Sequence, residues 1–269
     1  MRKALTIAGT DPSGGAGLHA DLKTFAALDV YGMGAVTAVV AQNTRGVVSV
    51  EHVSPAMIRA QIDAALSDIP PDAAKVGMAG TVESIAAIAA SLGSGPAFPL
   101  VVDPVMVSTS GHRLLAEEAE EALVQDIIPL ARVITPNIPE AEVLAHRAGW
   151  DGVRIESKED MERAARAIAS LTDAAILLKG GHRAQDADDL LYLDGVATWI
   201  PGHRVDTPHT HGTGCTLSAA LAAYLARGLS VIEAAQAAKE YLTGALSTGL
   251  ALGGGRGPVD HGWMARRYF

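Results

Sequence analysis

Residues 4–17 of the chain read ALTIAGTDPSGGAG, and this opening stretch gives the first indication of the fold. The apolar run 4–8 is typical of a short buried strand, and the glycine-rich run 9–17 is typical of a tight turn. A helical pattern of apolar residues follows over 16–28. A strand, a turn and a helix in this order form the repeating unit of α/β proteins.

The same alternation continues along the chain. Short apolar runs predict further strands at 35–41, 47–53, 74–76, 100–103, 133–135, 175–179, 190–193 and 198–201, the last two joined by a hairpin turn. Longer periodic patterns predict helices at 55–66, 82–92, 117–127, 139–148, 158–171, 213–227 and 232–246. Because the run Leu100-Val101-Val102 is apolar on both faces, we expect a mainly parallel sheet covered by helices on both sides. The sequence therefore predicts a three-layer α/β/α fold.

Length and composition limit the number of domains. A chain of 269 residues suits one large α/β domain or two small ones. No serine-rich linker and no block of charge divides it. We therefore expect a single domain over residues 1–269, with a small lid formed by residues 32–53.

Charge and cysteine content exclude several classes of protein. The single cysteine, Cys215, rules out an intrachain disulfide and a cysteine-rich zinc site. The net charge of -9 argues against a protein that coats nucleic acid, because such a protein needs a basic surface. Long uncharged stretches such as 84–102 are broken by glycine and proline, so none suits a bilayer span. We expect a cytoplasmic protein that binds neither nucleic acid nor membrane.

The first strand-to-helix turn fits neither of two common phosphate-binding motifs. A P-loop needs a lysine after its second glycine, whereas Gly14 is followed by Gly15. A dinucleotide-binding motif fails because Ala20 stands where the third glycine belongs. The turn is consistent either with a ligand that approaches the backbone closely or with a purely structural tight turn. Asp21, on the following helix, can face the same crevice.

Polar side chains follow three later strands, at the edge where open α/β sheets bind ligands. The Gln42 amide can hydrogen-bond a heteroaromatic ring. Asp103 ends a buried strand, where a carboxylate needs a partner or a cation such as Mg²⁺. Asn137 and Glu140 share the first turn of one helix, where their oxygens can meet a hydrated Mg²⁺ and nucleotide phosphates. Each residue also has a purely structural alternative, as a strand end, a turn cap or a helix start.

The strongest functional signal is the run 211–220, which reads HGTGCTLSAA. Gly212 and Gly214 open an alanine-rich helix, so backbone N–H groups and the helix dipole form an anion site suited to a transferring phosphoryl group. Cys215 lies at this positive end, where we expect a lowered thiol pKa and the role of a thiolate or general base. The alternative is a small buried cysteine at a helix start. His209 and His211 lack the acidic or cysteine partner that a zinc site needs.

Taken together, these segments resemble the hydroxymethylpyrimidine/phosphomethylpyrimidine kinases of thiamine biosynthesis, members of the ribokinase-like superfamily. The matching runs occur in order and are ALTIAGTDPSGGAG at 4–17, ADLKT at 20–24, AQNT at 41–44, DPVM at 103–106, HGTGC at 211–215 and GPV at 257–259. The resemblance implies a ribokinase-like fold. It also implies phosphorylation of 4-amino-5-hydroxymethyl-2-methylpyrimidine and then of its monophosphate, with ATP and Mg²⁺, by a homodimer.

The resemblance also implies a role for individual residues. Gln42 would hydrogen-bond the aminopyrimidine edge. The remaining substrate-pocket residues would be Gly9, Asp21, Met78 and Val105. Mg²⁺ would be organised by Asp103 and Glu140. The nucleotide would lie near Thr135, Asn137, Lys179 and Lys239. The anion site would be formed by Gly212, Thr213, Gly214 and Cys215, with Cys215 as the base.

Some positions depart from the family pattern, and other activities stay open. His112 stands where the family more often has an acidic residue, and we leave Thr109 in the same loop unassigned. A pyridoxal or pyridoxine kinase is the closest rival, since it performs the same chemistry on another hydroxymethyl heterocycle. Cys215 argues against a ribokinase-type sugar kinase, which typically has aspartate at this position. The presence of Asp103, Glu140 and Cys215 together argues against a silent binding protein.

Overall fold

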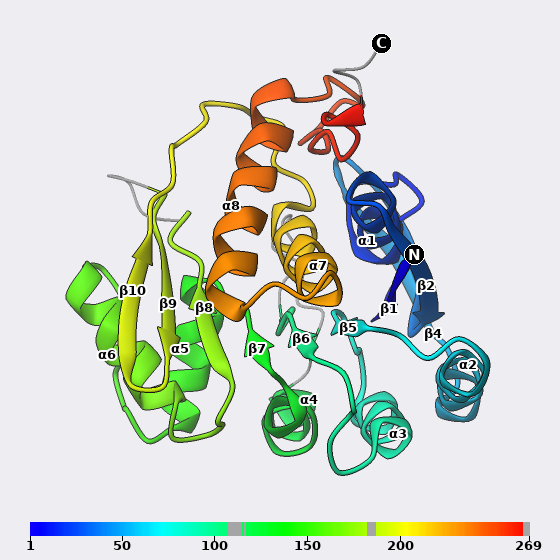
Figure 1. Cartoon of the computed structure of the whole chain (residues 1–269), viewed down its shortest axis with the longest axis horizontal. Helices are drawn as coiled ribbons and strands as arrows, with labels where there is room; N and C mark the ends of the chain where they lie inside the picture. Colours follow the sequence, from blue (N-terminus) through cyan, green and yellow to red (C-terminus); the bar gives the residue numbers. More distant parts are fainter. Residues whose placement is uncertain (107–114, 116, 182–186, 266–269) are drawn as a thin grey trace.

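An eight-stranded sheet forms the centre of the molecule (Figure 1), in a computed structural model that describes residues 1–106, 115, 117–181 and 187–265. The strand order is β10-β9-β8-β7-β6-β5-β1-β2. The six neighbouring strands β8, β7, β6, β5, β1 and β2 pair in parallel. β9 is antiparallel to both β8 and β10. The strands are β1 (Arg2–Ala8), β2 (Val30–Val36), β5 (Ala73–Val76), β6 (Leu100–Val102), β7 (Val133–Ile134), β8 (Ala175–Leu178), β9 (Asp189–Leu193) and β10 (Val196–Ile200).

Helices cover both faces of this sheet (Figure 1). One face carries α1 (Gly17–Ala27), α7 (Thr213–Ala226) and α8 (Val231–Thr248). The other carries α2 (Pro55–Asp68), α3 (Val82–Leu92), α4 (Glu117–Ala122), α5 (Ile138–Arg147) and α6 (Lys158–Ile168). In β6, Leu100 and Val102 join the core under the second group, and Val101 joins the core under the first. The predicted three-layer α/β/α fold with a mainly parallel sheet is therefore confirmed.

The strand predicted at 35–41 is wrong, because two different strands meet there. β2 ends at Val36, and β3 begins at Ala38. β2 pairs with β1 over seven residues, and sequence reasoning missed most of it because Gly32 and Gly34 interrupt its apolar pattern. Both glycines are needed for packing, since a Cβ atom on either would stand within 2.9 Å of a leucine side chain of α1.

The hairpin β3–β4 is a separate two-stranded sheet at the edge of the main one. It consists of β3 (Ala38–Asn43) and β4 (Gly46–His52), within the region expected to form a lid. The register shifts between Ala41 and Gln42, which marks a bulge where the strand turns a side chain to a new direction. The hairpin loop is fixed to the C-terminal region, since Arg256 N donates to Thr44 O at 3.0 Å. Gln42 is therefore carried by an element outside the main sheet.

Local signals in the sequence set several element boundaries correctly. The turn between β9 and β10 has positive φ at Asp194 and Gly195, as a two-residue hairpin requires. Ser157 and Asp160 form a capping box at the start of α6. The helix predicted at 117–127 differs, because α4 ends at Ala122 and the chain continues as a π-helical turn, Leu123–Ile127.

In the described part of the chain, no helix is both long and apolar enough to cross a membrane.

A buried ion pair joins strands β1 and β5 to helix α1. The Lys75 ammonium on β5 lies 2.8 Å from both carboxylate oxygens of Asp21 on α1, and Thr6 on β1 donates to the same carboxylate at 2.6 Å. All three side chains are fully buried. The Asp21 charge holds the pKa of Lys75 above its ordinary value, although burial acts in the opposite direction. Each charge is thus tolerated because the other is present.

We expect Lys75→Met to lower the free energy of unfolding by about 3–5 kcal/mol, because it leaves the Asp21 carboxylate buried without its cation. Urea unfolding followed by circular dichroism measures this change. The double variant Asp21→Leu/Lys75→Met removes both charges and should recover most of the loss. A loss below about 1 kcal/mol in the single variant would show that the pair is not coupled in this way.

Candidate active site

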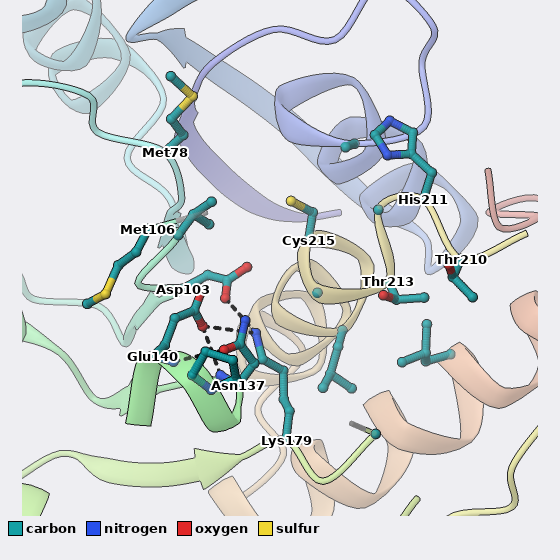
Figure 2. A pocket seen from close by; sticks show the side chains of 18 of the residues that line it. Met78, Asp103, Met106, Asn137, Glu140, Lys179, Thr210, His211, Thr213 and Cys215 are labelled. Carbon is teal, nitrogen blue, oxygen red and sulfur yellow. Dashed lines mark hydrogen bonds and ion pairs between the residues drawn. The ribbon is translucent and has the colours of Figure 1, made fainter. Parts of the chain in front are cut away.

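A cavity of about 1200 Å³ opens at the carboxyl ends of the parallel strands. It lies where open α/β sheets bind their ligands. Figure 2 shows the side chains of Asp103, Glu140 and Lys179 gathered in one part of this pocket, with Cys215 and Met78 farther along it. Loops after β1, β6, β7 and β8, the start of α7 and the hairpin β3–β4 all contribute to its walls. The cavity therefore brings together segments that are far apart in the sequence.

Three buried charges form the centre of the cavity. The Lys179 ammonium, after β8, lies 2.9 Å from Asp103 Oδ1 and 3.9 Å from Glu140 Oε2. Asp103 also accepts hydrogen bonds from Thr135 Oγ1 at 3.2 Å and from Ser218 Oγ at 3.1 Å. One cation is thus shared by two carboxylates that face the same space. We refer to Asp103, Glu140 and Lys179 as the carboxylate–lysine cluster.

The two carboxylates of the cluster respond differently to this environment. Burial favours the neutral form of each, but for Asp103 the charges of Lys179 and Lys75 outweigh burial and hold its pKa below the ordinary value. For Glu140, burial dominates and the negative charge of Asp103 adds to it, so its pKa rises to about 7. The cluster therefore contains one firmly ionised carboxylate and one that titrates near neutral pH.

The position of Glu140 is set by a capping box at the start of α5. Asn137 Oδ1 accepts from Glu140 N at 2.9 Å, and Glu140 Oε2 accepts from Asn137 N at 2.8 Å. The helix-start interpretation of these two residues is therefore correct, but it does not exclude a functional role. The same Glu140 oxygen that closes the capping box also lies near Lys179. The local cap places a carboxylate in the cavity.

The start of α7 lies directly beside the cluster. Gly212 caps the helix with φ of 82°, and a Cβ atom there would stand 1.8 Å from Gly15 O, so only glycine fits. A Cβ atom on Gly214 would lie 3.4 Å from Lys179 Nζ. The first N–H groups of any α-helix lack an intrahelical acceptor. The amides of Gly214 and Cys215 therefore lie beside the Lys179 cation, which is the arrangement that the anion site predicted from the sequence requires.

The thiol of Cys215 does not have the lowered pKa predicted from its place at a helix start. The sulfur accepts a hydrogen bond from the Gly17 amide, and Lys75 also favours the thiolate. Removal of the thiolate from water outweighs both effects, and the charges of Asp21 and Asp103 add to it, so the pKa of Cys215 rises to about 11. The prediction of a resting thiolate was therefore wrong, and the side chain is a neutral thiol at neutral pH.

Four of the five predicted substrate residues line one part of the cavity, and these are Gly9, Gln42, Met78 and Val105. The Gly9 backbone comes close to Met78, since a Cβ atom on Gly9 would stand 3.1 Å from the Met78 sulfur. Asp21 is the exception. It is fully buried in the ion pair with Lys75 and does not line the cavity. The expectation that Asp21 faces the crevice is therefore wrong.

Three of the four predicted nucleotide residues line the cavity, and these are Asn137, Lys179 and Lys239. Lys239 on α8 is held by Asp189 Oδ2 at 2.8 Å and by Ala187 O at 2.5 Å. Thr135 is fully buried beneath the cavity, where its hydroxyl supports Asp103. Thr109 and His112 lie outside the described residues.

Comparison with known proteins identifies the family. The family model for phosphomethylpyrimidine kinase matches residues 11–260. The chain belongs to the phosphomethylpyrimidine kinase family.

Individual relatives agree with this family. A hydroxymethylpyrimidine/phosphomethylpyrimidine kinase of Rhizobium meliloti is 50% identical over 262 residues, which cover 96% of each chain. Among solved structures, a phosphomethylpyrimidine kinase from Clostridium difficile 630 has 43% identity and a TM-score of 0.78, covering 90% of this chain and 98% of that one. A pyridoxal kinase from Staphylococcus aureus in complex with AMP-PCP and pyridoxal has 38% identity and a TM-score of 0.88, covering 99% and 95%. The predictions of a ribokinase-like fold and of a kinase are therefore confirmed.

Sequence reasoning missed two pairs that support the site of this family member. Asp11, in the first glycine-rich turn, is fully buried and lies 2.8 Å from His211 Nε2. Lys75 pairs with Asp21 below Cys215 and influences its charge. Asp11 and His211 are 200 residues apart, and Asp21 and Lys75 are 54 apart. No spacing rule links positions so distant, although each of the four lies in or near a segment that the sequence already singled out.

The pKa of Cys215 can be measured directly, because it is the only cysteine in the chain. Iodoacetamide reacts with the thiolate, so we expect the alkylation rate to rise about tenfold per pH unit from about pH 7 to about pH 10. The rise should not level off before the pKa of about 11 is approached. Cys215→Ser is the unreactive control. A plateau below about pH 8 would mean that the helix terminus, and not burial, controls the thiol.

Proposed function

We propose that the chain transfers the γ-phosphoryl group of ATP to 4-amino-5-hydroxymethyl-2-methylpyrimidine, and then to the resulting monophosphate, in thiamine biosynthesis. The observation that carries this proposal is a single cavity lined by Gln42, Met78 and Val105 as well as by the carboxylate–lysine cluster and the start of α7. Family membership supports both the reaction and its substrate class.

The acceptor would occupy the part of the cavity lined by Gly9, Gln42, Met78 and Val105. The Gln42 amide offers a donor and an acceptor together, which match the amino group and ring nitrogen of an aminopyrimidine. Met78 and Val105 supply apolar contact for the faces of the ring. The hydroxymethyl group would then lie toward Cys215 and the start of α7.

The phosphoryl group would be transferred between Lys179 and the amides of Gly214 and Cys215. Phosphoryl transfer depends mainly on positioning and on stabilising charge that develops on the transferred group. A lysine and helix N-terminal amides supply that stabilisation from a preorganised site. Because the Cys215 thiol is neutral at neutral pH, it would act as a base for the hydroxyl only through its small thiolate fraction. The anion site therefore contributes more than the base.

Mg²⁺ would be held by Asp103 and Glu140. The two carboxylates are buried, face the cavity and share one cation in this structure, so their oxygens fit the preference of Mg²⁺. Among the described residues, no group of three or more side chains forms a dedicated metal site. Mg²⁺ sites commonly use one or two carboxylates, water and substrate phosphates. When bound, the ion would neutralise charge on the nucleotide phosphates.

A pyridoxal kinase activity is the second candidate, and a specific comparison favours it. The solved pyridoxal kinase of Staphylococcus aureus covers nearly the whole chain with a TM-score of 0.88. Pyridoxal also carries a hydroxymethyl group on a flat heterocycle. The Gln42 amide favours the aminopyrimidine, because that ring offers an amino group beside a ring nitrogen.

The wider setting of the enzyme belongs to the same proposal. We propose one kinase domain over residues 1–269, acting in the cytoplasm as a homodimer. The family resemblance supports the dimer, and the continuous core of both helix layers supports the single domain.

Substrate choice is tested by ADP release with four acceptors, each supplied with ATP and Mg²⁺. We expect turnover with the hydroxymethylpyrimidine and its monophosphate, weaker turnover with pyridoxal, and none with ribose. Turnover with pyridoxal that exceeds turnover with both pyrimidines would favour the second candidate. Absence of ADP release with all four acceptors would contradict a kinase function.

The metal proposal is tested by Asp103→Asn. This variant removes the ionised carboxylate of the cluster, so the Mg²⁺ concentration for half-maximal activity should rise and turnover should fall by about 100-fold. Asp126→Asn, at an exposed acid on the π-helical turn, is the matched control and should behave like the unmodified enzyme. An unchanged Mg²⁺ requirement in Asp103→Asn would remove Asp103 from the metal site.

A further inference from the structure

His211 and Asp11 form a hydrogen-bonded pair at the edge of the cavity. His211 Nε2 lies 2.8 Å from Asp11 Oδ2, immediately before the glycine that caps α7. The Asp11 carboxylate also accepts from the amides of Ser13, Gly15 and Ala16, at 2.9, 3.1 and 2.8 Å. Although burial opposes its ionisation, the hydrogen bonds from His211 and Ser13 lower the pKa of Asp11 to about 2. Asp11 is therefore a permanent anion that fixes the His211 ring.

This arrangement leaves the other ring nitrogen of His211 available to a ligand. Nε2 is engaged with Asp11, and among the described residues Nδ1 has no hydrogen-bond partner. The ring lines the cavity, with its side chain 12% exposed. Figure 2 shows it over the first turn of α7, on the side where Thr213 and Cys215 begin the helix. A donor at Nδ1 would therefore act beside the anion site.

The two acceptors of the proposed reaction place different demands on this region. The first acceptor is a neutral alcohol, whereas the second carries a phosphate with about -1.5 to -2 charges at neutral pH. The second acceptor therefore needs more positive charge than the first. Among the described residues, three lysines line the cavity, and each is paired with an aspartate: Lys75 with Asp21, Lys179 with Asp103 and Lys239 with Asp189. Arg147, Arg204 and Arg256 line it as well. When both ring nitrogens of a histidine carry a proton, each is a hydrogen-bond donor and the ring adds one positive charge.

We propose that His211 donates a hydrogen bond from Nδ1 to the phosphate of the monophosphate acceptor, and that it thereby determines whether the enzyme performs the second phosphorylation. This inference rests on the proposed function and adds a specificity-determining residue to it. In the second transfer, an oxygen of the acceptor phosphate forms a bond to the γ-phosphorus of ATP. The bond between that phosphorus and its bridging oxygen breaks, and ADP leaves with the electron pair. The Nδ1 proton stays on His211 throughout.

Two substitutions of His211 separate its two nitrogens. The amide nitrogen of glutamine reaches the position of Nε2, so His211→Gln keeps a donor toward Asp11 and loses the donor at Nδ1. The amide nitrogen of asparagine reaches the position of Nδ1, so His211→Asn does the opposite. His52→Gln is the matched control, because His52 is exposed on β4 and does not line the cavity. Thermal unfolding of each variant reports whether the fold is retained.

The measurement is kcat/KM for the hydroxymethylpyrimidine and for its monophosphate. In His211→Gln we expect a loss of about 10- to 100-fold with the monophosphate, the usual effect of losing a hydrogen bond to a charged group, and less than about threefold with the alcohol. His211→Asn should keep the ratio of the two values within about fivefold of the unmodified enzyme. His52→Gln should change neither value.

Three results would overturn the assignment. The first is an equal change of kcat/KM with both acceptors in His211→Gln. The second is a ratio of kcat/KM for the monophosphate to kcat/KM for the alcohol that falls only in His211→Asn. The third is a ratio that falls equally in both variants. A fall confined to His211→Asn would assign the effect to the Asp11 contact, and an equal fall in both variants would assign it to the loss of the ring as a whole and not to Nδ1. Failure of the proposed function is recognised separately, since the unmodified enzyme would then fail to phosphorylate the alcohol.

Discussion

The Lys179 ammonium between Asp103 and Glu140 is the contact on which the rest of the site depends. Two carboxylates buried together, one after β6 and one in the first turn of α5, would repel each other and would lose their hydration, so neither could stay ionised alone. Lys179 lies within 4 Å of both and keeps Asp103 charged. The cluster in turn sets where α7 can begin, because Gly214 lies beside Lys179 and Ser218 donates to Asp103. Charge compensation thus fixes the relative positions of β6, β8, α5 and α7.

Close backbone packing provides the second constraint. Gly212 contacts the Gly15 carbonyl so closely that no side chain fits, and the Gly17 amide reaches the Cys215 sulfur. The two glycine-rich loops are therefore joined directly, and the Asp11–His211 pair joins them again through side chains. This packing brings an anion site formed by backbone amides next to the pocket that carries Gln42. It also leaves the Cys215 thiol only partly exposed, and the lost hydration of the thiolate explains why a residue at a positive helix end has a raised pKa.

The sequence predicted the layers well because buried parallel strands are apolar on both faces, as at Leu100-Val101-Val102. It failed at β2, where Gly32 and Gly34 serve the packing of α1 and hide the strand pattern. The site residues after strand ends were predicted because the edge of the sheet is visible in the sequence. Their charges were not, since the pKa of Cys215 and the burial of Asp21 depend on Lys75, which only the fold brings close. The identity of the acceptor came from resemblance to the family.

One cavity in this chain performs two successive phosphoryl transfers to the same pyrimidine. Phosphorus-31 nuclear magnetic resonance follows both transfers in one sample that contains the enzyme, the hydroxymethylpyrimidine, excess ATP and Mg²⁺. We expect a phosphomonoester signal to appear first and then to decline while the two signals of a pyrimidine diphosphate grow. A phosphomonoester signal that accumulates to completion, with no diphosphate, would contradict this expectation.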